Sequence, residues 1–234
     1  MGLWAILPAG GNGERFRQGG QADKLLATLQ GRPVLAWSAE AVLAAEAVEG
    51  LAVACRAEAR PGYEAVLRPL CERYGKPLRF APGGATRRES VAAALAAVPE
   101  GVAWVAVHDA ARPLLPSAWL DGAFAWLAAR ADSMGAVPAL PIADTVKRKA
   151  ADGDALGGTV DREALLRVQT PQILRRDILA QAHRAVPADT PVTDDAQLVE
   201  LAGLGAIAWL PGPACNVKVT EPDDLRWADA WLAR

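Results

Sequence analysis

The sequence predicts an α/β protein with a mostly parallel sheet and helices on both of its faces. From Leu3 to Arg130, short apolar runs typical of buried strands alternate with longer segments that have helical spacing. Polar or glycine-rich stretches follow several of these strands. Open parallel sheets bind ligands at that end of their strands, so we expect a site there. The sequence contains no repeat or linker, and we expect a single domain over residues 1–234.

Each element of the first half depends on its own local pattern. Apolar runs predict strands at Leu3–Leu7, Leu51–Cys55, Leu78–Ala81 and Val102–Val107. Apolar residues at helical spacing predict helices at Pro33–Ala47, Pro61–Tyr74, Thr86–Val98 and Ser117–Arg130. Gly75 is a natural C-cap for the second helix, and Thr86 with Glu89 has the capping-box spacing at the start of the third.

The second half adds further strands and helices. Strands are expected at Ser133–Leu140, Ala206–Leu210 and Asn216–Val219, and a helix at Arg175–Val186. Thr193 is expected to cap one more helix. Thr220, with Asp223 three residues on, is expected to cap a terminal helix over Thr220–Arg234.

Residues 142–162 differ in composition from the elements around them. Two polar, β-prone segments flank a turn at Asp152-Gly153-Asp154, which predicts a projecting hairpin over Ile142–Arg162. Such a hairpin has too little apolar surface to bury itself and is marginal alone. We therefore expect it to pack against a second subunit.

Composition excludes several classes of function. The chain is 52% hydrophobic and 22% charged, with a net charge of −2, so it can build a core but lacks the basic surface that nucleic-acid binding needs. Three separated cysteines and two histidines argue against a structural zinc site or a disulfide framework and favour a reducing compartment. No apolar run suits a signal peptide or a membrane span. We expect a cytoplasmic protein with no membrane partner.

The loop after the first strand is the first candidate site. Gly10, Gly11 and Gly13 follow the apolar run, and Arg15 and Lys24 follow the glycines. Glycines let the backbone approach an anion closely, and the two cations suit phosphate. The loop therefore indicates phosphate binding, although it matches neither the P-loop nor the dinucleotide fingerprint. A tight turn with solvated charges is the alternative explanation.

Six further polar segments lie at expected strand ends or helix starts. They are Gly83–Ser90, His108–Pro113, Thr159–Arg162, Gln169–Gln172, Thr193–Ala196 and Asn216–Thr220. Taken singly, each has an ordinary structural explanation: helix caps, a loop around a satisfied histidine, or a turn at Thr170-Pro171. Their number and order are more specific than any one of them.

In this order the segments closely resemble the 2-C-methyl-D-erythritol 4-phosphate cytidylyltransferase family of the non-mevalonate isoprenoid pathway. The resemblance runs from Pro8 to the last helix. It implies a Rossmann-like nucleotidyltransferase sandwich of three layers, in which the arm Ile142–Arg162 reaches across a homodimer. It also implies that the chain joins CMP from CTP to the acceptor phosphate, with Mg²⁺, and releases pyrophosphate.

The resemblance assigns roles residue by residue. Catalytic roles fall on Arg15, Lys24, Arg162 and Lys218. CTP contacts fall on Ala9, Gly10, Gly11, Gly84, Ala85, Ser90 and Asp109, with Arg87 supporting the same loop. Acceptor contacts fall on Asp109, Arg112, Thr145, Arg162, Thr170, Thr193 and Lys218. Of these, Thr145 and Arg162 would be donated by the arm of the partner subunit.

These residue types suit the implied chemistry. The nucleophile is a phosphate oxygen that is already ionised at neutral pH, so catalysis needs cations and backbone N–H groups to bring two anions together. Mg²⁺ would be held mainly by the triphosphate, with Asp109 as the one nearby protein group. Asp194 and Asp195 are expected to compensate a helix dipole and not to bind metal.

Three departures from the family pattern leave alternatives open. Asp23-Lys24-Leu25-Leu26 stands where Pro-Lys-Gln-Tyr is usual, the loop from Arg15 to Lys24 is slightly longer, and Gly10 replaces a common alanine. The first of these resembles guanylyltransferases of molybdenum-cofactor maturation, but only in the N-terminal region. The other two alternatives are a cytidylyltransferase for another polyol phosphate, such as ribitol 5-phosphate, and a non-catalytic nucleotide-binding protein. A non-catalytic nucleotide-binding protein would be expected to lack the basic residues that this chain retains.

Overall fold

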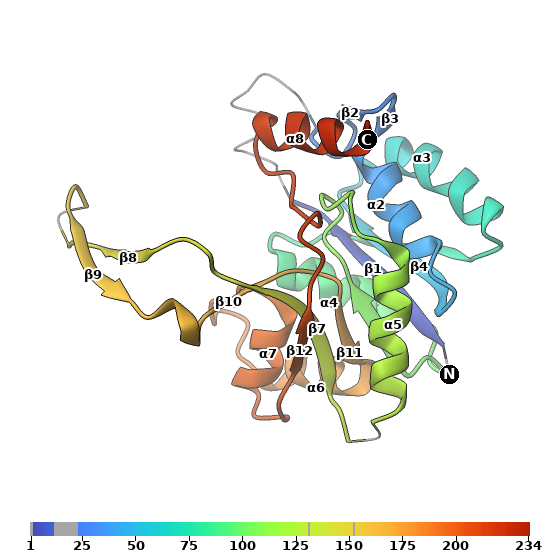
Figure 1. Cartoon of the computed structure of the whole chain (residues 1–234). Helices are drawn as coiled ribbons and strands as arrows, with labels where there is room; N and C mark the ends of the chain where they lie inside the picture. The colour runs from blue at the N-terminus through green and yellow to red at the C-terminus, as the bar shows by residue number, and fades with distance from the viewer. Residues whose placement is uncertain (1, 12–22, 131, 152) are drawn as a thin grey trace.

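An eight-stranded sheet forms the centre of the computed structural model, which describes residues 2–11, 23–130, 132–151 and 153–234. Its strands are β1 (Leu3–Ala9), β4 (Val48–Cys55), β5 (Leu78–Pro82), β6 (Trp104–Val107), β7 (Gly135–Pro141), β10 (Leu166–Val168), β11 (Gln172–Arg175) and β12 (Ala208–Pro211). The strand order is β10-β7-β11-β6-β1-β4-β5, and β12 pairs with β7 (Figure 1).

Most of the sheet is parallel, as predicted. Strand β1 runs parallel to β4 and β6, β4 to β5, and β7 to β12. Strand β11 is antiparallel to both β6 and β7, and β10 is antiparallel to β7. Strands β10 and β11 were not expected from the local sequence pattern, and the segment with the expected turn at Thr170-Pro171 joins these two strands.

Helices cover both faces of the sheet and complete the three layers. One face packs against α2 (Val34–Leu43), α3 (Arg60–Arg73) and α5 (Ser117–Ala128), through a core that includes Leu3, Ala5 and Leu7 of β1. The other face packs against α4 (Arg87–Ala97), α6 (Arg176–Ala185) and α7 (Asp195–Leu201), through a core that includes Trp4 and Ile6. Because alternate β1 residues enter opposite cores, the strand is apolar along nearly its whole length.

A smaller cluster fixes the C-terminal helix above the end of the sheet. Helix α8 (Pro222–Leu232) packs with the short ribbon of β2 (Thr28–Leu29) and β3 (Arg32–Pro33), around buried Leu29, Val34 and Val219 (Figure 1). No helix among the described residues combines the length and apolarity needed to cross a membrane.

The predicted hairpin is present. Strands β8 (Val146–Lys149) and β9 (Leu156–Val160) pair antiparallel and project from the body, and the 3₁₀ helix η1 (Arg162–Ala164) follows them (Figure 1). Leu156 has 79% of its surface exposed. The sequence pattern therefore identified the arm correctly.

Two predicted helix caps are confirmed. Thr86 and Glu89 form the capping box of α4, with both reciprocal hydrogen bonds present. Gly75 follows the end of α3 with φ +63°, a left-handed conformation that glycine adopts without strain. The boundaries of most predicted elements shift by a few residues, as frayed ends usually do; α2, for example, ends at Leu43 and not at Ala47.

Three other assignments are wrong. Asp194, not Thr193, is the N-cap of α7, because its carboxylate accepts the Gln197 N–H while the Thr193 hydroxyl donates to the Gln197 side chain. Glu221, not Thr220, caps α8, where Pro222 takes the first helical position and Asp224 completes the box. Residues 216–219 form a loop and not a strand.

Candidate active site

Main chain forms the floor of a pocket at the carboxyl ends of β1, β4 and β5. A Cβ at Gly10 would lie 2.7 Å from Ser90 Oγ and 3.3 Å from Gly83 Cα, so two loops meet at a distance that only glycine allows without rearrangement. Ser90 Oγ accepts the Gly84 N–H at 3.1 Å and donates to Thr86 O at 3.0 Å. Ser90 therefore ties the loop that contains Gly83 and Gly84 to the start of α4.

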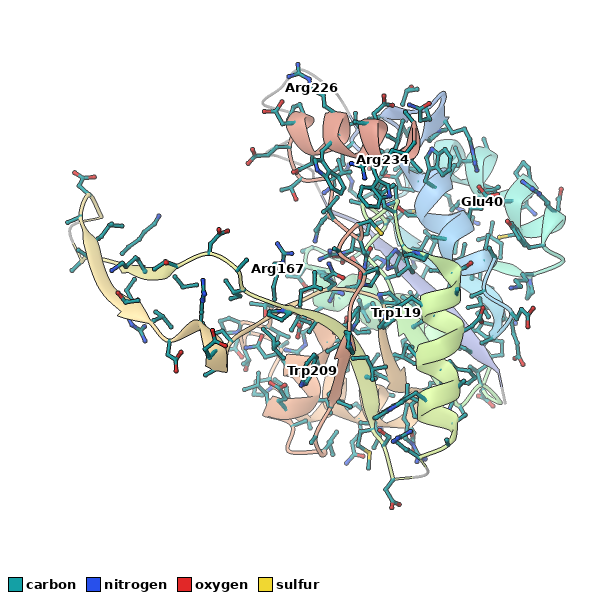
Figure 2. The ribbon with its side chains drawn as sticks, in the orientation of Figure 1. Glu40, Trp119, Arg167, Trp209, Arg226 and Arg234 are labelled. Carbon is teal, nitrogen blue, oxygen red and sulfur yellow. The ribbon has the colours of Figure 1, made fainter. Side chains whose placement is uncertain are left out.

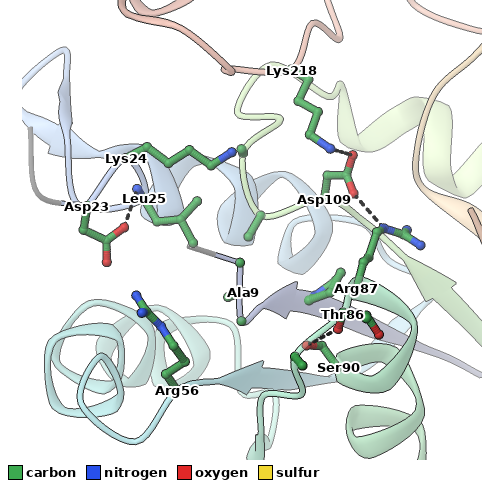
Figure 3. A pocket seen from close by; sticks show the side chains of 16 residues that line it. Ala9, Asp23, Lys24, Leu25, Arg56, Thr86, Arg87, Ser90, Asp109 and Lys218 are labelled. Carbon is green, nitrogen blue, oxygen red and sulfur yellow. Dashed lines mark hydrogen bonds and ion pairs between the residues drawn. The ribbon is translucent and has the colours of Figure 1, made fainter. Parts of the chain in front are cut away.

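Charged side chains from separate elements surround this floor. Lys24, Arg56, Arg87 and Lys218 line the described part of the pocket together with Asp23 and Asp109 (Figure 3). Cations outnumber carboxylates, although the whole chain is acidic. Local excess positive charge in a cleft favours a polyanionic ligand such as a nucleoside triphosphate.

Asp109 is the electrostatic centre of the pocket. Its Oδ2 lies 3.0 Å from Lys218 Nζ and 3.3 Å from Arg112 Nε, and its Oδ1 lies 3.4 Å from Arg87 Nε. Burial alone would raise the pKa of Asp109, but Lys218, Arg87 and Arg112 together lower it well below its ordinary value. The carboxylate is therefore ionised and acts as an anchor for cations, not as an acid or a base.

A buried hydrogen-bond chain fixes the backbone behind Asp109. His108 is fully buried, and desolvation lowers its pKa to about 4, so its ring is neutral. Its Nε2 lies 3.0 Å from Arg112 O, an acceptor, so Nε2 carries the proton and Nδ1 does not. Thr170 Oγ1 must then donate to Nδ1, at 3.2 Å, while it accepts the Asp109 N–H at 3.0 Å.

The loop at 216–219 carries Lys218 to this centre. Asn216 is fully buried and donates from Nδ2 to Thr170 O at 2.7 Å, and its own carbonyl accepts from Arg112 Nη1 at 2.9 Å. The Val219 N–H donates to Ala111 O at 2.8 Å. These contacts take the place of strand pairing, which explains why a strand-like sequence forms a loop here.

Gln172 attaches α7 to the same edge of the sheet. Its Oε1 accepts the backbone N–H groups of Asp195 and Ala196, both at 2.9 Å, and its Nε2 donates to Asp194 Oδ2 at 3.0 Å. The Asp195 carboxylate is 3% exposed, and its Oδ2 lies 2.8 Å from Arg87 Nη2 in an ion pair without good hydrogen-bond alignment. Both aspartates are thus occupied by protein groups.

The structure brings together many, but not all, of the predicted site residues. Residues lining the pocket are Ala9, Gly10, Gly11, Lys24, Ala85, Ser90, Asp109 and Lys218, and Gly84 belongs to the floor beneath them. Arg112 and Thr170 lie behind Asp109, with their polar groups engaged as described above. Thr193 is exposed at the start of α7. Thr145 and Arg162 lie on the arm and do not line the pocket, and Arg15 lies outside the described residues.

Residues 3–234 match the family 2-C-methyl-D-erythritol 4-phosphate cytidylyltransferase. The chain belongs to this family. The family member of Halorhodospira halophila is 43% identical over 236 residues, covering 98% of this chain and 93% of that protein. The family member of Xanthomonas campestris pv. campestris is 41% identical over 229 residues, covering 95% of this chain and 82% of that protein.

Solved structures of the cytidylyltransferase family support the same assignment. The crystal structure of the Thermus thermophilus cytidylyltransferase is 32% identical to this chain, covers all of both chains and superposes with a TM-score of 0.78. The nucleotidyltransferase sandwich and the family expected from the order of the motifs are therefore confirmed.

Two residues of this cytidylyltransferase site went unrecognised or only partly recognised in the sequence. Arg56 directly follows β4 and lines the pocket. Its position after an apolar strand was the available signal, but a single arginine at a strand end is common. Arg87 was expected to support the loop at Gly84, and the structure shows it in ion pairs with Asp109 and Asp195.

The departure at Asp23 has a structural explanation. Asp23 Oδ1 accepts the Leu25 N–H at 2.9 Å, and Oδ2 accepts from Tyr63 Oη at 2.8 Å. This carboxylate therefore connects the turn that carries Lys24 to α3. Lys24 Nζ itself reaches Val219 O at 3.5 Å. Its side chain extends from the turn at Asp23 towards the side of the pocket that holds Lys218 (Figure 3).

Proposed function

We propose that this chain transfers CMP from CTP to 2-C-methyl-D-erythritol 4-phosphate, giving 4-diphosphocytidyl-2-C-methyl-D-erythritol and pyrophosphate. The observation that carries the proposal is the convergence of Lys24, Arg56, Arg87 and Lys218 on a main-chain floor, in a chain that matches the family from residue 3 to residue 234. A triphosphate and a monophosphate repel each other, and cations on several sides of one cleft reduce that repulsion.

The nucleotide contacts rest on the pocket floor and its nearest cations. Gly10, Gly11 and Gly84 present backbone to the nucleotide, with Ala9, Ala85 and Ser90 beside them. Ser90 keeps the Gly84 loop close to the floor, which limits the room for a base. Lys24, with Arg15 beyond the described residues, stabilises charge on the α-phosphate and on the departing pyrophosphate.

The acceptor contacts rest on the cations around Asp109. Lys218 and Arg112 are held there by ion pairs and can exchange that carboxylate for a substrate phosphate. Thr193 is exposed at the start of α7 and its hydroxyl can turn to the phosphate. Thr170 contributes by holding Asp109 through its backbone, since its hydroxyl is already shared with His108. The acceptor phosphate then attacks the α-phosphate in line, with pyrophosphate leaving on the opposite side.

The residues of this site fit an Mg²⁺ ion that is bound mainly by the nucleotide. No group of three or more metal-binding side chains occurs among the described residues. Asp23 and Asp109 are the carboxylates that line the described part of the pocket, and Asp23 is already hydrogen-bonded to the Leu25 N–H and to Tyr63. Mg²⁺ binds readily through phosphate oxygens and one carboxylate. When bound with CTP it would supply further neutralisation of the phosphate charge. Asp109 would be its one protein contact.

We further propose a homodimer in which the arms are exchanged. Thr145 and Arg162 do not line the pocket of their own chain, and they belong to an arm that projects from the body (Figure 1). Exposed apolar side chains lie along the arm and its neighbouring strands: Leu156, Leu166, Val168 and, labelled in Figure 2, Trp209. Exposed apolar side chains on and near a projecting hairpin support a subunit interface. A cytoplasmic location stays a prediction from the cysteine pattern.

The direct test is Mg²⁺-dependent release of pyrophosphate. CTP, UTP, GTP and ATP would each be paired with 2-C-methyl-D-erythritol 4-phosphate and with ribitol 5-phosphate. We expect release with CTP and the methylerythritol substrate alone. Release with ribitol 5-phosphate as the better acceptor would preserve the chemistry and overturn the acceptor. No release with any pair would favour the non-catalytic nucleotide-binding protein.

A further inference from the structure

Arg87 occupies an unusual position between two carboxylates. It is the first residue of α4, its side chain is 27% exposed, and it lines the pocket. Its Nε lies 3.4 Å from Asp109 Oδ1 in the loop after β6 (Figure 3). Its Nη2 lies 2.8 Å from Asp195 Oδ2 at the start of α7. One guanidinium thus connects the ends of three separate elements.

Asp195 depends on Arg87 for its neutralisation. Its side chain is 3% exposed, and Arg87 is the only cation in an ion pair with it in the part of the chain that the structure describes. Burial raises the pKa of Asp195, and the neighbouring Arg87 opposes that rise. Removing Arg87 would therefore leave a buried carboxylate without a counter-charge.

Asp109 differs because it has three cations around it. Lys218, with a side chain 41% exposed, is the most accessible of them, followed by Arg87 at 27%, whereas Arg112 is 12% exposed. Lys218 and Arg112 are both expected to bind the acceptor phosphate. When they turn to that phosphate, Arg87 is the remaining described cation that balances Asp109. Its second ion pair, to Asp195, keeps the Arg87 side chain beside Asp109 and prevents it from turning to the phosphate.

We propose that Arg87 is a positioning residue for cytidylyl transfer, which holds Asp109 in place while Lys218 and Arg112 turn to the acceptor phosphate. It does not itself contact the reacting atoms. The same side chain fixes α7, which carries Thr193 at its start, against the nucleotide side of the pocket. This inference rests on the proposed function.

The test separates neutralisation of Asp195 from positioning of Asp109. Arg87→Gln, Asp195→Asn and the double variant are made in the full chain, and thermal unfolding, kcat and both KM values are measured. Arg87→Gln alone should lose stability and turnover. The double variant removes the unpaired charge at Asp195, so its stability should return towards wild type. Its kcat/KM for the acceptor should stay below wild type by about tenfold or more.

Two comparisons make the result decisive. Arg175→Gln is a matched control, because Arg175 pairs with Trp104 at the opposite end of β6 and, within the described residues, its one ion pair is with the exposed Asp177. Arg87→Lys keeps one positive charge but cannot pair with both carboxylates, so it should fold and still lose acceptor kcat/KM by about fivefold. Wild-type kinetics in either the double variant or Arg87→Lys would overturn the inference. Absent turnover in the wild-type protein would instead overturn the proposed function.

Discussion

Lys218 illustrates how a single side chain is prepared for a ligand. Its carrier loop is fixed at both sides, by the Asn216 amide on Thr170 O and by the Val219 N–H on Ala111 O. The ammonium itself is 3.0 Å from Asp109 Oδ2, on a side chain that is 41% exposed. A rigid backbone with an accessible charge favours binding of an anion, because little conformational entropy is lost.

Changing Lys218→Ala should impair use of the acceptor. A bound phosphate would lose its nearest counter-charge, at a cost of about 2–5 kcal/mol in acceptor kcat/KM. Steady-state kinetics with each substrate varied in turn measures this, and the KM for CTP serves as the internal control because it should change less. Near-wild-type dependence on acceptor concentration would contradict the role.

At the scale of elements, the start of α4 connects stability to the nucleotide site. Glu89 Oε2 accepts the N–H groups of Ala85 and Thr86 at 2.6 and 3.2 Å, and Thr86 Oγ1 accepts the Glu89 N–H at 3.1 Å. The cap therefore shapes the same loop that meets Gly10 at the pocket floor. A weaker cap should disturb both.

Thr86→Ala should lower the free energy of unfolding by about 1 kcal/mol, because α4 loses its N-cap side chain. It should also raise the KM for CTP, since Glu89 loses the hydrogen bond to Thr86 that helps to position it against the loop. Urea unfolding and steady-state kinetics measure the two effects. Thr86→Ser keeps the hydroxyl and should restore both values; an unchanged KM in Thr86→Ala would show that loop and cap are independent.

Local patterns predicted most elements but could not predict β11. Periodicity identified β1, β4 and β6 because their apolar residues form long enough runs. In β11 only Ile173 and Leu174 are apolar, and the strand exists because β6 and β7 pair with it on both sides. Such pairing between distant segments leaves no trace in a local window.

The same distinction between local patterns and contacts of distant segments explains which site residues could be predicted. Asp109 and Ser90 were predictable, because motif residues at the carboxyl ends of parallel strands meet at one edge. The role of Asn216 was not, because its strand-like neighbours gave no sign that its amide binds Thr170 O. The partnership of Arg87 with Asp195 joins two helix starts far apart in sequence, so only the fold reveals it.

At the scale of the whole molecule, arm exchange can be tested by mixing subunits. Arg162→Ala subunits mixed with Lys218→Ala subunits should regain activity, because one site of each heterodimer then has both residues. With random mixing, about a quarter of wild-type activity is expected, from half of the dimers with one active site in two. Pyrophosphate release after subunit exchange measures it.

The matched control combines Lys24→Ala with Lys218→Ala. Both residues line the pocket of a single chain, so every heterodimer site lacks one of them and no recovery is expected. If neither mixture recovers activity, although mass measurements verify that subunits exchanged, then Arg162 either acts in the site of its own chain or has no role in the site.

The two histidines should make the protein less stable in mild acid. Burial lowers the pKa of His108 and of His183 to about 4, from an ordinary 6.5, with Arg88 adding to the effect at His183. The unfolded chain binds these protons more readily, so stability is full above pH 6.5 and falls as the pH drops towards 4.

His183→Gln should reduce that acid sensitivity without touching the active site. For the partly exposed His183, we expect a contribution of about 1–2 kcal/mol, discounted for solvent screening. Urea unfolding of wild type and variant at about pH 7 and about pH 4.5 gives the difference. An equal loss of stability in both proteins would contradict the assignment.

The position of β11 between β6 and β7 also constrains how the chain folds during synthesis. Strand β6 is buried along its length, yet its partner on one edge is made only after β7 and the whole arm have emerged. Until then the nascent sheet presents an apolar edge with unpaired backbone groups. The return of the chain from the arm to β11 is therefore the step that joins β6 to β7, and a ribosome stalled within the arm would hold an aggregation-prone intermediate.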